Sequence, residues 1–169
     1  KGASFAVVNK VNKSANLSKQ LLVKDSLKSL TNISEKIRLN SLSNIIAITG
    51  SCGKTTLKEL LANIFSKISR ISYSPKSYNN KYGVPISLFN INKKDDFGIF
   101  EIGMDKKGEI DSLSKIIKPN VGIITNISYA HAKNFNNLEQ IAEAKSEIIN
   151  NINKNGSMVL NADDSFFLK

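Results

Sequence analysis

The sequence predicts an α/β fold in which helices cover both faces of a mostly parallel sheet. From about residue 44 onward, short apolar runs alternate with stretches that carry apolar residues at helical spacing. The first apolar run leads through a glycine-rich turn into the first helical stretch. Parallel strands need helical connections between them, so this alternation is typical of a parallel sheet with two helical layers.

The expected elements follow in order along the chain. After the glycine turn, the pattern gives a helix, a short strand and then an asparagine-rich loop; the next helix is closed by Pro119. The expected strands are residues 45–48, 71–73, 98–102, 121–127 and 158–160. The expected helices are residues 54–66, 109–117 and 138–149.

The first 40 residues do not follow this alternation. Residues 3–8 and 20–23 are short apolar runs, and residues 26–39 carry apolar side chains at helical spacing. We interpret residues 1–40 as the tail of a small preceding α/β domain with its connector helix, and residues 41–169 as a second domain.

Composition excludes several classes of protein. The 169 residues are 41% hydrophobic, enough for one good core. No stretch approaches the roughly 18 consecutive apolar residues of a membrane helix, and the N-terminal apolar run is too short for a secretory signal. Cys52 is the only cysteine, which excludes an internal disulfide and a thiolate metal cluster. We therefore expect a cytoplasmic protein without membrane insertion.

The net charge of +10 raises the possibility of a nucleic-acid partner. However, the lysines are scattered along the chain, no dense basic run occurs, and the aromatic residues do not alternate with the charges. We interpret the charge as a solvated basic surface, and we expect no nucleic acid among the partners.

Residues 49–56 carry the first chemical motif, between an apolar strand and a helix. They are Thr49, Gly50, Ser51, Cys52, Gly53, Lys54, Thr55 and Thr56. In this context the motif predicts a phosphate-binding loop, with backbone N–H groups converging on the phosphates, Lys54 on the β and γ phosphates and the Thr55 hydroxyl on Mg²⁺. Ile48 stands where the strict pattern has glycine, so the loop is a shortened variant; a purely structural turn is the alternative.

Two titratable residues follow the next strands of the predicted sheet. Glu101 ends a strand expected beside the first, and ligands of open α/β sheets bind outside the carboxyl ends of the strands. A carboxylate there suits a hard cation; the alternative is a solvated strand-end glutamate. His131, the only histidine, comes four residues after Ile127 and is a candidate to ligate a metal or orient a phosphate. A further helix carries Lys145, which helix periodicity alone predicts to be exposed to solvent.

Together these motifs resemble the central domain of the Mur ligases and their folylpolyglutamate synthase relatives. The resemblance runs from about residue 45 to residue 164, and the family's phosphate loop matches residues 49–56 with the same shortened spacing. It implies that the cofactors are ATP and Mg²⁺, that Glu101 and His131 bind Mg²⁺ together with Thr55, and that Lys145 is carbamylated and lies on or near a metal ion. It also implies that Lys54, His131 and Lys145 are the catalytic residues.

Three further segments resemble the branch of the family that joins D-alanyl-D-alanine to UDP-N-acetylmuramoyl-tripeptide. They are residues 79–85, 108–110 and 161–164, which read NNKYGVP, GEI and NADD. The resemblance implies these two small-molecule substrates, a monomeric protein, contacts from Asn79 and Asn80 to substrate or phosphate, and a UDP-sugar-binding domain that ends within residues 1–40. Cys52 and the segment 104–107 depart from the common pattern of the branch.

The resemblance also implies a reaction. ATP phosphorylates the terminal carboxylate of the nucleotide-linked peptide, and the amine of D-alanyl-D-alanine attacks the acyl phosphate. The chain stops before the remaining strands of such a domain, so we expect the activity in a longer parent and not in these residues alone. Other Mur ligases, folylpolyglutamate synthase, another P-loop enzyme such as a small kinase, and a non-catalytic nucleotide- or nucleic-acid-binding module are the alternatives.

Overall fold

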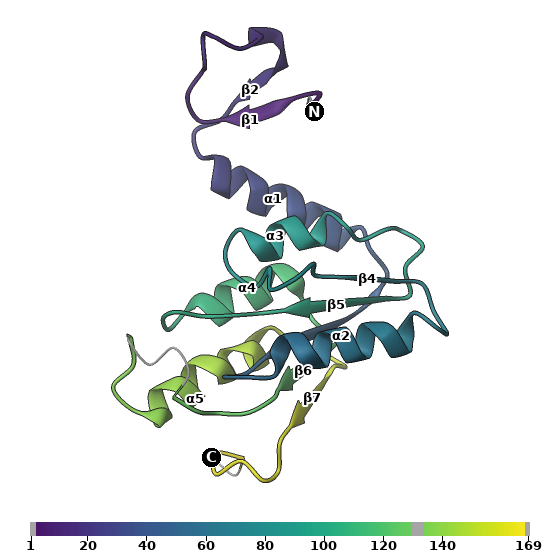
Figure 1. Cartoon of the computed structure of the whole chain (residues 1–169), viewed down its shortest axis with the longest axis vertical. Helices are drawn as coiled ribbons and strands as arrows, with labels where there is room; N and C mark the ends of the chain where they lie inside the picture. The colour runs from purple at the N-terminus through teal and green to yellow at the C-terminus, as the bar shows by residue number, and fades with distance from the viewer. Residues whose placement is uncertain (1–2, 130–133, 168–169) are drawn as a thin grey trace.

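The computed structural model describes residues 3–129 and 134–167, and its larger part is a five-stranded parallel sheet (Figure 1). The strand order is β4-β5-β3-β6-β7. The strands are β3 (Asn44–Thr49), β4 (Ile71–Tyr73), β5 (Phe97–Glu101), β6 (Val121–Ile124) and β7 (Ser157–Leu160). All four pairings are parallel, which confirms the predicted sheet.

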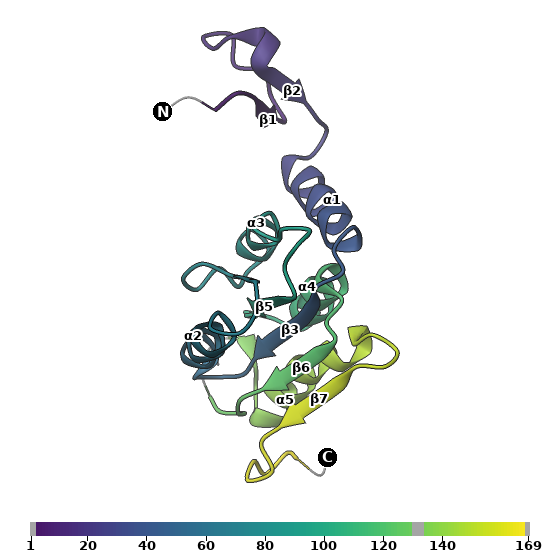
Figure 2. The ribbon, with the colours of Figure 1, turned by 90° about the vertical axis from the view of Figure 1, so that its right-hand side faces the viewer.

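Helices cover both faces of this sheet (Figure 2). They are α2 (Lys54–Phe65), α3 (Gly83–Leu88), α4 (Glu109–Ile117) and α5 (Leu138–Ser146), the last continued by the 3₁₀ helix η3 (Glu147–Asn151). Side chains of β3 alternate between the two faces: Ile46 and Ile48 pack with Ala62 of α2, whereas Ile45 and Ala47 belong to the core under α3, α4 and α5. The predicted layers are therefore confirmed.

Strand β3 lies at the centre of the sheet, with β5 on one side and β6 on the other. The chain fills the β4 and β5 side first and then crosses to the β6 and β7 side. The topological switch point is thus at the carboxyl end of β3, where open α/β sheets bind their ligands. The segment that leaves β3 at this point is the predicted phosphate loop.

Three local predictions need correction. The asparagine-rich segment after β4 contains the short helix α3, β6 ends at Ile124 and not at residue 127, and the helix expected over residues 138–149 tightens to 3₁₀ geometry after Ser146. The early end of β6 has a clear cause, because the chain beyond Ile124 turns toward the phosphate loop, which Thr125 and Asn126 contact.

The N-terminal residues form a second, small sheet that lies away from the larger one (Figures 1 and 2). It pairs β1 (Ala6–Val8) with β2 (Gln20–Leu22) in parallel, joined through the 3₁₀ helix η1 (Leu17–Lys19). Helix α1 (Ser26–Leu39) then runs to the main sheet and packs against α3 and α4. Near its end, Arg38 donates from Nε to the Ile117 carbonyl at 2.6 Å. The domain boundary at residue 40 stays a prediction.

Among residues 3–129 and 134–167, no helix has the length and apolar character needed to cross a membrane.

Candidate active site

The phosphate loop connects β3, which ends at Thr49, to α2, which begins at Lys54. Gly53, at the N-cap position of α2, has left-handed backbone geometry with φ of 80° and offers no side-chain acceptor to the first N–H groups of the helix. Unsatisfied N–H groups at a helix N-terminus carry partial positive charge and bind phosphate. The geometry here is therefore that of a phosphate cradle.

The chain that follows β6 holds the loop in shape. Thr125 donates from Oγ1 to the Cys52 carbonyl at 2.6 Å, and the Cys52 N–H donates to Asn126 Oδ1 at 3.1 Å. Ser51 and Ser128 exchange two hydrogen bonds, each 2.8 Å long. These partners lie 73 to 77 positions from the loop residues they contact. Sequence patterns missed them because no local signal reports such distant contacts.

Gly50 has no room for a side chain. Its φ is 142°, and a Cβ there would lie 1.9 Å from Thr125 Oγ1. We expect Gly50→Ala to lower the free energy of unfolding by about 1–3 kcal/mol, because strained backbone and a steric clash add together. Chemical denaturation measures this loss. Gly53→Ala is the matched control, since its added Cβ meets no atom within 4 Å and only the left-handed backbone opposes it. Equal losses in both variants would show that the Thr125 contact has no effect.

Lys54 lies folded over the loop that precedes it. Its Nζ donates to the Gly50 carbonyl at 2.8 Å and to the Ser51 carbonyl at 3.4 Å. Burial lowers the pKa of Lys54, while the charges of Glu101 and Cys52 oppose that shift. An ammonium held at the mouth of a phosphate cradle is placed to exchange these carbonyls for phosphate oxygens.

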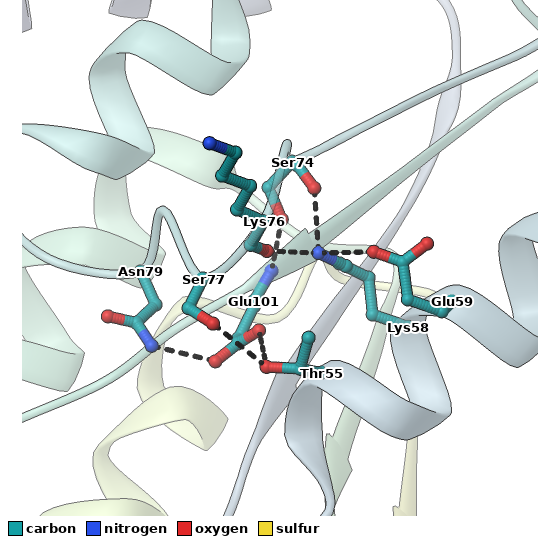
Figure 3. A network of polar contacts seen from close by, with 8 residues as sticks. All are labelled: Thr55, Lys58, Glu59, Ser74, Lys76, Ser77, Asn79 and Glu101. Carbon is teal, nitrogen blue, oxygen red and sulfur yellow. Dashed lines mark hydrogen bonds and ion pairs between the residues drawn. The ribbon is translucent and has the colours of Figure 1, made fainter.

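Glu101 is the centre of a polar network beside the loop (Figure 3). It is 1% exposed, and its two carboxylate oxygens accept hydrogen bonds from different elements. Thr55 Oγ1 of α2 donates to Oε2 at 2.7 Å, and Asn79 Nδ2 donates to Oε1 at 2.7 Å. Ser77 Oγ lies 3.3 Å from Thr55 Oγ1. The structure thus brings together Thr55, Glu101 and Asn79, while sequence reasoning missed Ser77.

The donor set of this network fits a hard divalent cation. A buried carboxylate needs compensating charge, and among the described residues Glu101 has no ion-pair partner within 4.0 Å. Mg²⁺ is commonly held by one or two carboxylates while phosphate oxygens and waters complete its octahedron. Within the described ranges no cluster of three or more His, Cys, Asp and Glu side chains occurs. His131 lies outside the described residues.

Lys145 is buried, with 3% of its surface exposed, so the solvent-exposed position predicted from helix periodicity is wrong. Burial first, and then the positive charge of Lys54, lower the pKa of Lys145 to about 8. The Glu147 carboxylate fixes the end of α5 by accepting from the N–H groups of Gly108 at 2.7 Å and Asp111 at 3.1 Å, at the start of α4. Because the charge of Lys54 acts on Lys145, the end of α5 lies on the side of the phosphate loop.

Comparison with known proteins agrees with this geometry. The Mur ligase middle domain matches residues 48–169. The chain belongs to the Mur ligase family. It is 39% identical over 169 residues to the UDP-N-acetylmuramoyl-tripeptide--D-alanyl-D-alanine ligase of Rickettsia prowazekii, and 32% identical over 149 residues to the protein of that name in Escherichia coli. These alignments cover 100% and 88% of this chain but 38% and 33% of the relatives, so the chain spans well under half of their length.

Solved Mur ligases share the fold. MurF from Acinetobacter baumannii superposes with a TM-score of 0.89 at 36% identity, covering 98% of this chain and 36% of that one. MurF from Thermotoga maritima in complex with ADP gives 0.84 at 30% identity, covering 96% and 38%. A mutant folylpolyglutamate synthase of L. casei gives 0.56 at 15% identity, which shows a likeness of fold alone.

The Mur ligase segment 79–85 owes part of its pattern to local structure. Asn80 Oδ1 accepts from the N–H groups of Tyr82 at 3.1 Å and Gly83 at 2.9 Å, at the start of α3. A Cβ on Gly83 would lie 2.6 Å from the backbone of Tyr78, so only glycine fits. The side-chain oxygen of Asn80 is thus engaged in starting α3, whereas Asn79 reaches the carboxylate of Glu101.

The segment 161–164 also has a structural connection to the site. Asp164 Oδ2 accepts from the Ile127 N–H at 2.7 Å, and Ile127 lies between Asn126 and Ser128, which contact the phosphate loop. The stretch that carries Asn126 and Ser128 is therefore held from two sides. Sequence reasoning identified the segment from resemblance but did not predict this contact.

Proposed function

We propose that the full-length protein containing this chain is an ATP-dependent ligase that joins D-alanyl-D-alanine to UDP-N-acetylmuramoyl-tripeptide, with ADP and phosphate as the other products. The observation that carries the proposal is the phosphate loop at the carboxyl end of β3, with Thr55 bonded to the buried Glu101 beside it. Relatives that bear the name of this ligase align with the whole chain at 39% and 34% identity.

In the proposed reaction the γ-phosphoryl group of ATP passes to the terminal carboxylate of the tripeptide, which gives an acyl phosphate and ADP. The amine of D-alanyl-D-alanine then attacks the acyl carbon, and phosphate leaves. The protein contributes by positioning the reactants and neutralising charge. Lys54 places its ammonium on the phosphates, and the N–H groups at the start of α2, which no side chain caps, bind their oxygens.

Thr55 and Glu101 are the residues that would hold a Mg²⁺ ion near the phosphates, and Asn79 orients the carboxylate of Glu101. When bound, such an ion neutralises phosphate charge during transfer. We further propose His131 as a ligand to a second ion, and Asn79 and Asn80 as contributors to the substrate or phosphate contacts. Because the side-chain oxygen of Asn80 is already engaged at the start of α3, we propose that Asn80 contributes indirectly, by positioning α3.

We propose that Lys145 carries a carbamate. A carbamate forms when a neutral amine attacks carbon dioxide and releases one proton, and a pKa of about 8 provides a larger neutral fraction near neutral pH than the ordinary value of 10.5 does. The product is an anion, which would replace the unfavourable charge pair of Lys54 and Lys145 with an attractive one. Four further expectations stay predictions. They are that residues 1–40 are the end of a UDP-sugar-binding domain, that the protein is a monomer, that it has no nucleic-acid partner and that it is cytoplasmic.

Glu101→Gln tests the cation site. It removes the negative charge but keeps the shape of the side chain, so we expect the Mg²⁺ concentration for half-maximal ligase rate to rise by at least about tenfold. A Mg²⁺ titration at saturating ATP measures the change. Glu35→Gln on α1, outside the loop network, is the control and should leave the titration unchanged. An unchanged Mg²⁺ requirement in Glu101→Gln would remove Glu101 from the cation site.

The proposed activity is tested with the full-length protein by phosphate release. We expect release only when ATP, UDP-N-acetylmuramoyl-tripeptide and D-alanyl-D-alanine are all present, with one amide product formed for each phosphate. Release with a folate and glutamate in place of these substrates would assign the protein to the folylpolyglutamate synthase relatives. Nucleotide binding without any ligation would leave only a binding module.

A further inference from the structure

Lys58 is a buried lysine for which the proposed reaction gives no role. It lies on α2, one helical turn after Thr55 and on the same face. Its side chain is 0% exposed, whereas most lysines keep the ammonium in water. Burial of an ammonium costs free energy unless each N–H finds an acceptor and the charge finds a counter-charge. The contacts of Lys58 therefore indicate what this burial achieves.

Three acceptors surround the ammonium, equal to its three donors (Figure 3). Lys58 Nζ donates to the Ser74 carbonyl at 2.8 Å and to the Lys76 carbonyl, and it forms an ion pair with Glu59 Oε1 at 3.0 Å. Lys76 has left-handed backbone geometry with φ of 48°, which is unfavourable for a residue with a side chain. A charge-assisted hydrogen bond to its carbonyl stabilises that conformation.

The two carbonyls belong to the loop after β4, residues 74–79, which supplies part of the candidate cation site. Ser77 lies 3.3 Å from Thr55, and Asn79 donates to Glu101 at 2.7 Å. Ser74 also accepts from the Glu101 N–H through its hydroxyl at 3.2 Å. One face of α2 thus contacts this loop twice, through Thr55 at the cation site and through Lys58 one turn away.

We propose that Lys58 is a positioning residue, which holds the loop of residues 74–79 so that Ser77 and Asn79 stay aligned with Thr55 and Glu101. Through this alignment it increases the affinity for the Mg²⁺ form of the nucleotide, and not for the nucleotide alone. The inference rests on the proposed function in assigning a Mg²⁺-nucleotide to the site. A purely structural lysine would change stability and leave the metal dependence of binding as it is.

The test uses Lys58→Met in the full-length protein, because methionine keeps the approximate length and fills the buried space without donors. We expect Mg²⁺-dependent ADP binding to weaken about tenfold, the range found when residues that orient metal ligands are removed, while ADP binding in EDTA changes less than about twofold. Calorimetric titration measures both. Lys67→Met is the matched control, since Lys67 is exposed just after α2 and the charge change is the same.

A double-mutant cycle identifies the route of the effect. Asn79→Ala removes the side chain through which the loop reaches Glu101, so Lys58→Met should weaken Mg²⁺-dependent binding much less in the Asn79→Ala background. Additive effects would overturn the proposed route. If Lys58→Met yields no folded protein, Lys58→Gln, which keeps two N–H donors, is measured in the same way.

The outcomes separate this inference from the proposed function. Folded Lys58→Met with wild-type binding in both Mg²⁺ and EDTA overturns the positioning role and leaves the ligase proposal intact. The wild-type protein could bind Mg²⁺-ADP and yet release no phosphate from ATP in the presence of both substrates. This result would contradict the ligase proposal, whereas the comparison of ADP binding by wild type and Lys58→Met would still test the positioning role. Equal losses in Mg²⁺ and in EDTA would show a structural lysine, and would also overturn the inference.

Discussion

Lys54→Ala in the full-length protein should reduce ATP-dependent ligation by about a hundredfold to a thousandfold, the range for loss of one donor that stabilises transition-state charge. Among the described residues, the ammonium of Lys54 donates hydrogen bonds only to the carbonyls of Gly50 and Ser51, so we expect it to contribute to charge stabilisation and little to the core. Phosphate release at saturating substrates measures the loss, and thermal unfolding monitors the fold.

The control for Lys54→Ala is a second lysine-to-alanine substitution, at an exposed position outside the phosphate loop. Lys115→Ala on α4 also removes one positive charge and should leave the rate within about twofold, as surface substitutions usually do. Turnover of Lys54→Ala at the wild-type rate would mean that residues 49–56 form a structural turn. A large loss of thermal stability in Lys54→Ala would assign the lysine a structural role in the loop.

Lys145→Ala should reduce the ligation rate of the full-length protein about as much as Lys54→Ala does, because it removes the proposed anionic carbamate from the metal centre. Chloride or short carboxylates should restore part of the rate by occupying the vacated position. The rate is measured at saturating ATP and Mg²⁺, with and without these anions. Replacing a solvent-exposed lysine would instead change stability by under about 0.5 kcal/mol and leave the rate unchanged.

The matched control for Lys145→Ala is Glu143→Gln on the same helix. Glu143 forms an exposed ion pair with Lys107 at 2.9 Å, and such pairs contribute little to stability, so Glu143→Gln should leave both fold and turnover nearly unchanged. Labelling with ¹³C-bicarbonate should give a carbamate signal in wild-type protein that disappears in Lys145→Ala. Wild-type turnover in Lys145→Ala, with the same carbamate signal in both proteins, would exclude the metal-ligand role.

Much of the fold follows from the sequence by local rules. The four apolar residues 45–48, followed by a glycine-rich turn and a helical stretch, are sufficient to predict β3, the phosphate loop and α2, because each depends on neighbours in the chain. The alternation of strands and helices predicts the parallel sheet for the same reason. The position of Glu101 at the end of a strand beside β3 also follows, since parallel strands end at one edge.

Only the tertiary structure decided which side chains of the helices are buried and what they contact. Lys58 and Lys145 lie on helices whose sequence pattern is compatible with exposure, and both are buried, one among carbonyls of the 74–79 loop and the other near Lys54. Asn126 and Ser128 reach the phosphate loop across more than 70 positions of the chain. The physical reason is that charge burial depends on acceptors and charges brought from distant segments, which helical periodicity does not report.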